Sequence, residues 1–95
     1  MAKARTPGRP LKALLVLPWG DGCWVREYEL PFPPFRGLGI RLDVYEVMNV
    51  ESVVVGDPGY DVTCIVAFDE MTPADRKRVT DDRIRALGFE EGGYP

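Results

Sequence analysis

Glycine and proline constrain what this chain of 95 residues can fold into. Ten glycines and nine prolines are spread along it without a period. Each proline fixes φ and removes a backbone donor, so that helix interiors and central strands avoid it. The segments between these breaks are short and apolar, and 45% of all residues are hydrophobic. The chain is therefore expected to form one small globular domain of short elements joined by turns.

Most of the apolar segments favour strands. Leu11–Leu17 is an almost continuous apolar run ended by turn residues, which predicts a buried strand. Residues 23–30 alternate with a period of two and would form a hairpin with it. Further strands are expected over 40–47, 50–55 and 60–68. The last of these has the clearest apolar stripe, made by Val62, Cys64, Val66 and Phe68.

A single helix is predicted near the C-terminus. Thr72 can cap it, Pro73 suits its first position and Gly88 can end it. The expected fold class is α+β: an antiparallel sheet of four to five strands with one C-terminal helix packed on one face. The expected organisation is a flexible basic N-terminal arm, a single domain and a loose acidic C-terminal tail, at residues 1–10, 11–89 and 90–95.

The residues that are missing exclude several chemistries. The chain has no histidine and no glutamine. Cys23, between a glycine turn and Trp24, superficially resembles the nucleophile segment of papain-like proteases, but that chemistry needs a histidine as base and acid. Two cysteines without an imidazole also cannot complete a tetrahedral zinc site within one chain. We therefore expect no enzyme, no metal and no cofactor.

Charge is distributed unevenly along the chain. Residues 1–12 carry four basic residues and no acid, whereas residues 13–95 carry eight basic and fifteen acidic ones. A basic arm on an acidic body can bind an anionic partner or fold back on its own domain. Gly8-Arg9-Pro10 is the central tripeptide of AT-hook arms, although Pro7 replaces the arginine that precedes it there. The candidate nucleic-acid-binding residues are Arg5, Arg9 and Lys12 on the arm and Arg78 and Arg85 on one helix edge.

Two features point to a protein partner. Residues 31–36 match P-x-x-P-x-R, a polyproline-ligand pattern, but their place between two strands favours a structural crossover. Two phenylalanines on such a rigid crossover would form a contact patch if exposed. Ile65 and Ala67, opposite the core stripe, indicate that the second sheet face is not fully solvated, and self-association as a homodimer or a protein partner would cover it. The candidate partner-binding residues are Phe32, Phe35, Arg36 and Trp19.

The leading hypothesis is a small non-catalytic protein-interaction or regulatory protein that acts through its sheet surface and its Pro-Phe crossover. The alternatives are a nucleic-acid-associated accessory protein and an acidic inhibitor of a nucleic-acid-binding protein. No apolar stretch is long enough to span a membrane, and the start of the chain is a poor secretion signal. Two cysteines in this length favour reduced thiols and a cytoplasmic location without a membrane partner.

Overall fold

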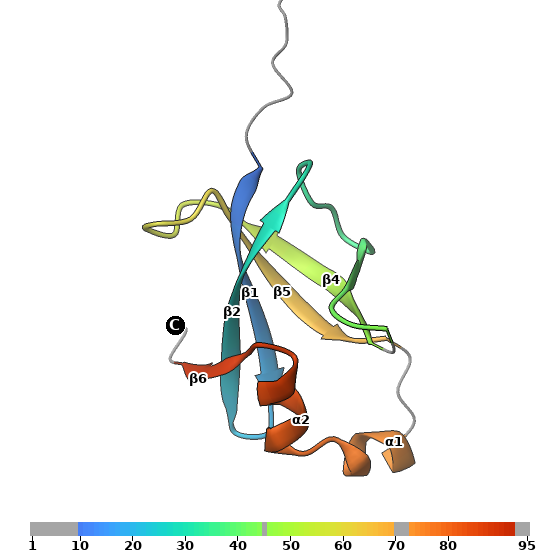
Figure 1. The fold of residues 1–95 in the computed structure, drawn as a ribbon. Helices are drawn as coiled ribbons and strands as arrows, with labels where there is room; N and C mark the ends of the chain where they lie inside the picture. The colour runs from blue at the N-terminus through green and yellow to red at the C-terminus, as the bar shows by residue number, and fades with distance from the viewer. Residues whose placement is uncertain (1–9, 45, 70–72, 93–95) are drawn as a thin grey trace, which may run out of the picture.

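The computed structural model describes residues 10–44, 46–69 and 73–92. In this part of the chain, six strands form one mixed sheet in the order β3-β4-β5-β1-β2-β6, and two short helices follow β5 (Figure 1). The elements are β1 (Leu11–Trp19), β2 (Gly22–Leu30), β3 (Gly39–Arg41), β4 (Val47–Val54), β5 (Val62–Phe68), α1 (Pro73–Arg78), α2 (Asp81–Ala86) and β6 (Glu90–Gly92).

The expected hairpin of β1 and β2 is confirmed. The two strands pair antiparallel over their whole length, from Leu11 opposite Leu30 to Trp19 opposite Gly22. Gly20 in the turn has a φ of 63°, the left-handed conformation that two-residue hairpin turns require. Because β1 lies between β2 and β5, the apolar run that begins the domain becomes a central strand.

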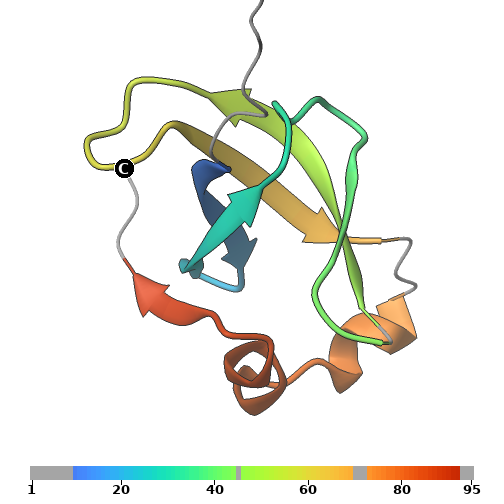
Figure 2. The ribbon, with the colours of Figure 1, turned by 45° about the horizontal axis from the view of Figure 1, so that its top comes forward.

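The prediction of an antiparallel sheet is wrong, because β1 and β5 pair parallel. Antiparallel β3 and β4 follow the proline-rich crossover, and β5 then pairs antiparallel with β4. This arrangement brings β5 to the free edge of β1 in the same direction as β1. A parallel pair needs a long connection, and the segment between β1 and β5 supplies it. Figures 1 and 2 show β4 and β5 running obliquely to β1 and β2, as expected for a twisted sheet.

The sheet also has more strands than the four or five expected, because Glu90–Gly92 pairs with β2 as β6. These residues were predicted to lie in the loose acidic tail. A Cβ on Gly92 would come within 2.8 Å of Val25 Cγ2, so the absence of a side chain lets the backbone approach β2. The rest of that tail, and residues 1–9 of the expected arm, lie outside the described residues.

One continuous C-terminal helix is not found, since the chain forms α1 and α2 with a break at Val79 and Thr80. The Thr80 hydroxyl accepts a hydrogen bond from Arg83 N at 3.2 Å, and Asp81 and Asp82 occupy the first turn of α2. A capping threonine followed by acidic residues favours a new helix start over continuation. Gly88 ends α2 with a φ of 92°, as expected from the sequence. The predicted cap Thr72 lies outside the described residues.

The expected strand over 40–47 is reduced to β3. The chain turns after Leu42, where the Asp43 carboxylate accepts a hydrogen bond from Glu46 N at 2.9 Å. An aspartate that bonds the backbone ahead of it stabilises a turn in place of a strand. The pairing of β4 with β5 is irregular between Val50 and Ser52, where the register shifts.

The core lies on one side of this twisted sheet. The stripe predicted on β5 is buried, as are the inward side chains of β1. Ile84, Leu87 and Phe89 bring α2 and the residues after it into the same cluster. The members on the strands are Ala13, Leu15, Leu17, Trp24, Leu30, Ile40, Met48, Val50, Val62, Cys64, Val66 and Phe68.

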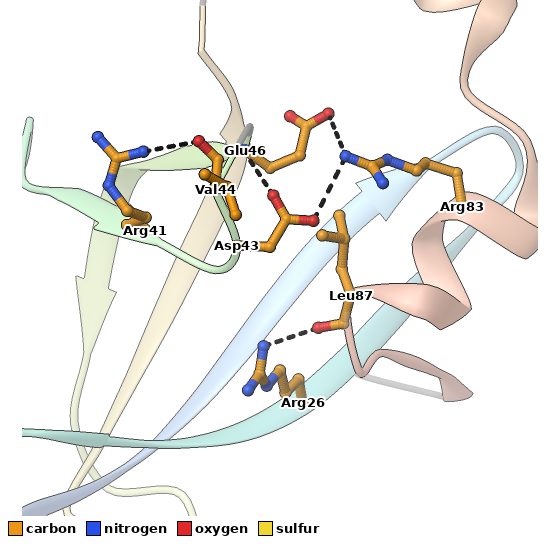
Figure 3. A network of polar contacts seen from close by, with 7 residues as sticks. All are labelled: Arg26, Arg41, Asp43, Val44, Glu46, Arg83 and Leu87. Atoms are coloured by element: carbon orange, nitrogen blue, oxygen red, sulfur yellow. Dashed lines mark hydrogen bonds and ion pairs between the residues drawn. The ribbon is translucent and has the colours of Figure 1, made fainter.

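Polar contacts hold α2 against the sheet from two directions (Figure 3). Asp43 and Glu46 lie in the turn between β3 and β4. Arg83 Nη2 of α2 lies 3.5 Å from Asp43 Oδ2 and 3.1 Å from Glu46 Oε1. Arg26 Nη1 of β2 donates to the carbonyl of Leu87 at 2.7 Å. The last helix is therefore tied to both halves of the sheet. Neither this helix nor α1 is long and apolar enough to cross a membrane.

Candidate interaction surface

The sheet face opposite the core carries a row of apolar side chains. Strand register places Val16 of β1 between Val25 of β2 and Ile65 of β5. Leu14 lies beside Val16 on the same face of β1. We call this surface the open face, because no helix or strand among the described residues forms a second layer over it and α2 packs into the core on the other side. Its apolar members are Leu14, Val16, Pro18, Val25, Ile65 and Ala67.

The open face is an apolar surface in partial contact with water. Val16 is 2% exposed because its neighbours enclose it, whereas Leu14, Val25, Ile65 and Ala67 are half-buried. Sheets with one solvated face normally alternate apolar and polar side chains. This face does not, and its position fits the expectation drawn from Ile65 and Ala67.

Two shallow depressions flank the row. One, of about 570 Å³, is lined by residues that include Leu14, Val25 and Tyr60. The other, of about 260 Å³, is lined by residues that include Pro18, Ile65 and Ala67. Members of the apolar row therefore line both hollows.

Carboxylates surround this face. Glu27 and Glu29 of β2 and Glu90 of β6 lie on its β2 side, and Glu51 lies on its β4 side. Glu27 accepts a hydrogen bond from the Tyr60 hydroxyl at 3.0 Å. That bond, with a smaller contribution from desolvation, raises the pKa of Tyr60, because ionisation would place a phenolate against a carboxylate.

The Pro-Phe crossover forms a second exposed apolar surface. Phe32 is 47% exposed and Phe35 is 54% exposed, and Arg36 beside them is also exposed. The end of the crossover is fixed to β4, since Gly37 N donates to Val50 O at 2.8 Å. In both views the crossover and the C-terminal end of β4 lie at the same end of the molecule (Figures 1 and 2).

Trp19, the fourth candidate partner-binding residue, is held by its own neighbours. Its ring meets Phe68 edge-on at 5.1 Å between centroids, and the Arg76 guanidinium lies 4.6 Å above it. The ring is half-buried and packs against the core. The structure therefore places Trp19 apart from the two exposed phenylalanines, as a link between β1 and α1.

The three candidate nucleic-acid-binding residues that the structure describes, Lys12, Arg78 and Arg85, lie on three different elements. Arg5 and Arg9 lie outside the described residues. Lys12 is exposed, with its Nζ 5.3 Å from the Tyr60 ring centroid. The break at Thr80 places Arg78 in α1 and Arg85 in α2, so the two do not share an edge of one helix. Their guanidinium groups therefore do not form the predicted stripe.

Arg85 also has partners within the domain. Its guanidinium lies 5.2 Å from the Trp24 ring centroid, 3.3 Å from Asp82 Oδ1 and 3.5 Å from Glu91 Oε1. Arg78, by contrast, is exposed in the last turn of α1. The charge of Arg85 is thus partly neutralised by adjacent acids.

Both cysteines are free thiols. Cys23 Sγ donates to the carbonyl of Gly92 at 3.0 Å, and Cys64 is fully buried, which raises the pKa of its thiol. A depression of about 670 Å³ adjoins Cys23 and is also lined by Asp21, Asp81 and Glu91. Within residues 10–44, 46–69 and 73–92, no three potential metal-binding side chains gather at one point.

Four members of the open face were not predicted from the sequence: Leu14, Val16, Pro18 and Val25. The signal was present in the almost continuous apolar run Leu11–Leu17, because such a run does not suit a strand with one solvated face. Comparisons with protein-family models, with curated proteins and with solved structures find no match to this chain.

Proposed function

We propose that this chain is a small non-catalytic protein-interaction domain that binds a partner protein through the open face and the Pro-Phe crossover. The observation that carries the proposal is the half-buried apolar row of Leu14, Val25, Ile65 and Ala67, on a sheet face over which no described element forms a second layer. Contiguous apolar surface on a small domain is a feature of interaction sites.

The crossover supports the same function. Prolines restrict the backbone of residues 31–34, so Phe32 and Phe35 would lose little conformational entropy on binding. Aromatic side chains are enriched in the buried centres of protein interfaces. Two exposed phenylalanines on a restrained segment are therefore well suited to a contact surface.

A nucleic-acid-associated role is the second candidate, carried by the exposed basic run of Arg76, Lys77 and Arg78 in α1. Arg76 stacks on Trp19, and Asp75 lies in the same helix. Salt-dependent binding to DNA or RNA, lost in an Arg78→Ala and Lys77→Ala variant, would support this role over the first. The four glutamates around the open face, which we call the acidic rim, would also suit an inhibitor of a nucleic-acid-binding protein. Such an inhibitor is a special case of a protein-binding domain.

Location in a reducing compartment such as the cytoplasm is part of the proposal. The two free thiols, one of them fully buried, are consistent with it.

Site-specific photo-crosslinking in the native cell tests the function. A benzophenone amino acid is placed at Ala67 on the open face, at Phe35 on the crossover, or at Asp82 on α2 as the exposed control. We expect discrete light-dependent adducts from Ala67 or Phe35 that Asp82 does not give. An adduct with the mass of two chains would identify a homodimer. Absence of adducts at both sites, or the same adducts at all three, would refute the proposal.

A further inference from the structure

We propose that the partner segment bound by the open face has an apolar centre flanked by arginine or lysine side chains. This inference rests on the proposed function and specifies the partner's chemistry. Its first support is the shape of the face, where Leu14 and Val25 line one shallow hollow and Ile65 and Ala67 line another. An apolar centre on the partner would remove these half-buried side chains from water.

The second support is the charge of the rim. Glu29, Glu51 and Glu90 form no ion pair with any other described residue, and Glu27 contacts the neutral Tyr60 hydroxyl. Four carboxylates around an apolar patch repel one another, and basic side chains on a partner would relieve that repulsion while steering the encounter.

Basic groups of the domain itself neutralise this rim only in part. Lys12 lies opposite Glu29 in the register of β1 and β2, and Arg26 lines the same hollow as Glu27 and Glu90. Lys12 and Arg76 border the open face, and each lies over an aromatic ring, of Tyr60 and Trp19 respectively. Four carboxylates therefore face three basic groups, which leaves an excess of negative charge around the face.

A second copy of this chain fits the face less well. In a symmetric pair the same patch meets itself, which would place the acidic rims of two copies against each other. The chain's own residues 1–9 are basic, but their apolar side chains are limited to Met1, Ala2, Ala4 and Pro7. Met1 is the one large apolar side chain among them, so that segment has little apolar surface with which to cover the row.

The test is a selection of random peptides displayed on phage against the full chain, with sequencing of the enriched clones. The apolar centre is altered by Val25→Thr with Ile65→Thr, which retains strand-forming side chains. The rim is altered by Glu29→Lys with Glu90→Lys, two exposed positions whose substitution leaves the core unchanged. The matched control is Asp21→Lys with Asp81→Lys, the same charge change beside the β1–β2 turn.

We expect enriched peptides that combine large apolar residues with arginine or lysine. A synthetic copy should bind the rim variant at least about tenfold more weakly at low salt, with a smaller difference at high salt. It should bind the control variant almost as tightly as the unmodified chain. Because the rim variant alters only exposed residues, the comparison of the rim variant with its control remains a valid test even if the threonine variant fails to fold.

The possible outcomes distinguish an error in the partner's chemistry from an error in the proposed function. Neutral or acidic peptides that lose binding in the threonine variant would overturn the inference and leave the proposed function standing. Peptides sensitive only to Phe32→Ser with Phe35→Ser would do the same by moving the site to the crossover. Enrichment of no peptide at all would contradict the function itself.

The two other occupants have their own readouts. A dimer seen by sedimentation and abolished by Ile65→Thr would assign the face to a second copy. Amide shifts at Val25 and Ile65 on deletion of residues 1–9 would assign it to the arm. Either result would overturn the inference.

Discussion

Replacing Phe89 by alanine tests whether the segment after α2 belongs to the domain core. Phe89 is 2% exposed and packs in the same cluster as Ile84 and Leu87. Truncating a fully buried phenylalanine removes its transfer free energy and leaves a cavity, at a cost of about 3–5 kcal/mol. That is a large part of the roughly 5–15 kcal/mol by which a domain is stable.

The assay is equilibrium unfolding in urea, followed by the fluorescence of Trp19 and Trp24. For a loss of about 4 kcal/mol and an m-value of about 2 kcal/mol per molar, the midpoint falls by about 2 M. An unchanged m-value would show that the substitution alters stability and not the extent of unfolding.

Phe35→Ala is the matched control, because it is the same chemical change at a ring that is 54% exposed. Burying a whole phenylalanine is worth at most about 3 kcal/mol, so the covered half accounts for less than about 1.5 kcal/mol, and no closed cavity forms. The midpoint should therefore fall by less than about 1 M. If the two variants lose the same stability, the C-terminal segment is not docked as described and the reasoning fails.

Three further substitutions or modifications test other parts of the structure. Thr80→Ala removes the cap of α2 and should cost about 1 kcal/mol in the same urea assay, whereas Thr80→Ser should cost much less. Because the pKa of Tyr60 is raised in the folded chain, the contribution of this residue to stability is complete below pH 10 and is lost as the pH rises through the folded pKa. Glu27→Gln should therefore lower the midpoint of the Tyr60 phenolate titration. An unchanged midpoint would refute the hydrogen bond from Tyr60 to Glu27 as the cause of the raised pKa. Iodoacetamide should modify Cys23 in the folded chain and Cys64 only on unfolding, as read by mass spectrometry; equal rates would show that Cys64 is not enclosed.

Local signals in the sequence were sufficient for the elements whose boundaries are set by neighbouring residues. The β1–β2 hairpin follows from an apolar run, a glycine turn and an alternating strand. The inward stripe of β5 follows from its period of two, and Gly88 ends α2 as expected. Each of these features depends on interactions between residues that are close in the sequence, so local sequence patterns can predict it.

Features that depend on pairing between residues far apart in the sequence could not be predicted from local patterns. Nothing near Val62 indicates that β5 lies parallel to β1, and nothing near Glu90 indicates a partner in β2. The helix break depends on a local balance, because Thr80 can either continue α1 or cap α2, and in the structure it caps α2. The open face was foreseen from Ile65 and Ala67, while Val25 joins it only through the strand register.

The parallel pairing of β1 with β5 also bears on how the chain folds as it is synthesised. β1 is the first strand to emerge, yet one of its two edges is completed only by residues 62–65. Until then the β1–β2 hairpin has an apolar strand with unpaired backbone groups along one side. Contacts so far apart in sequence slow folding, and an exposed strand edge invites pairing with other chains. A fragment that ends before β5 should therefore aggregate, and the emergence of β5 from the ribosome is the step that protects the open edge of the central strand.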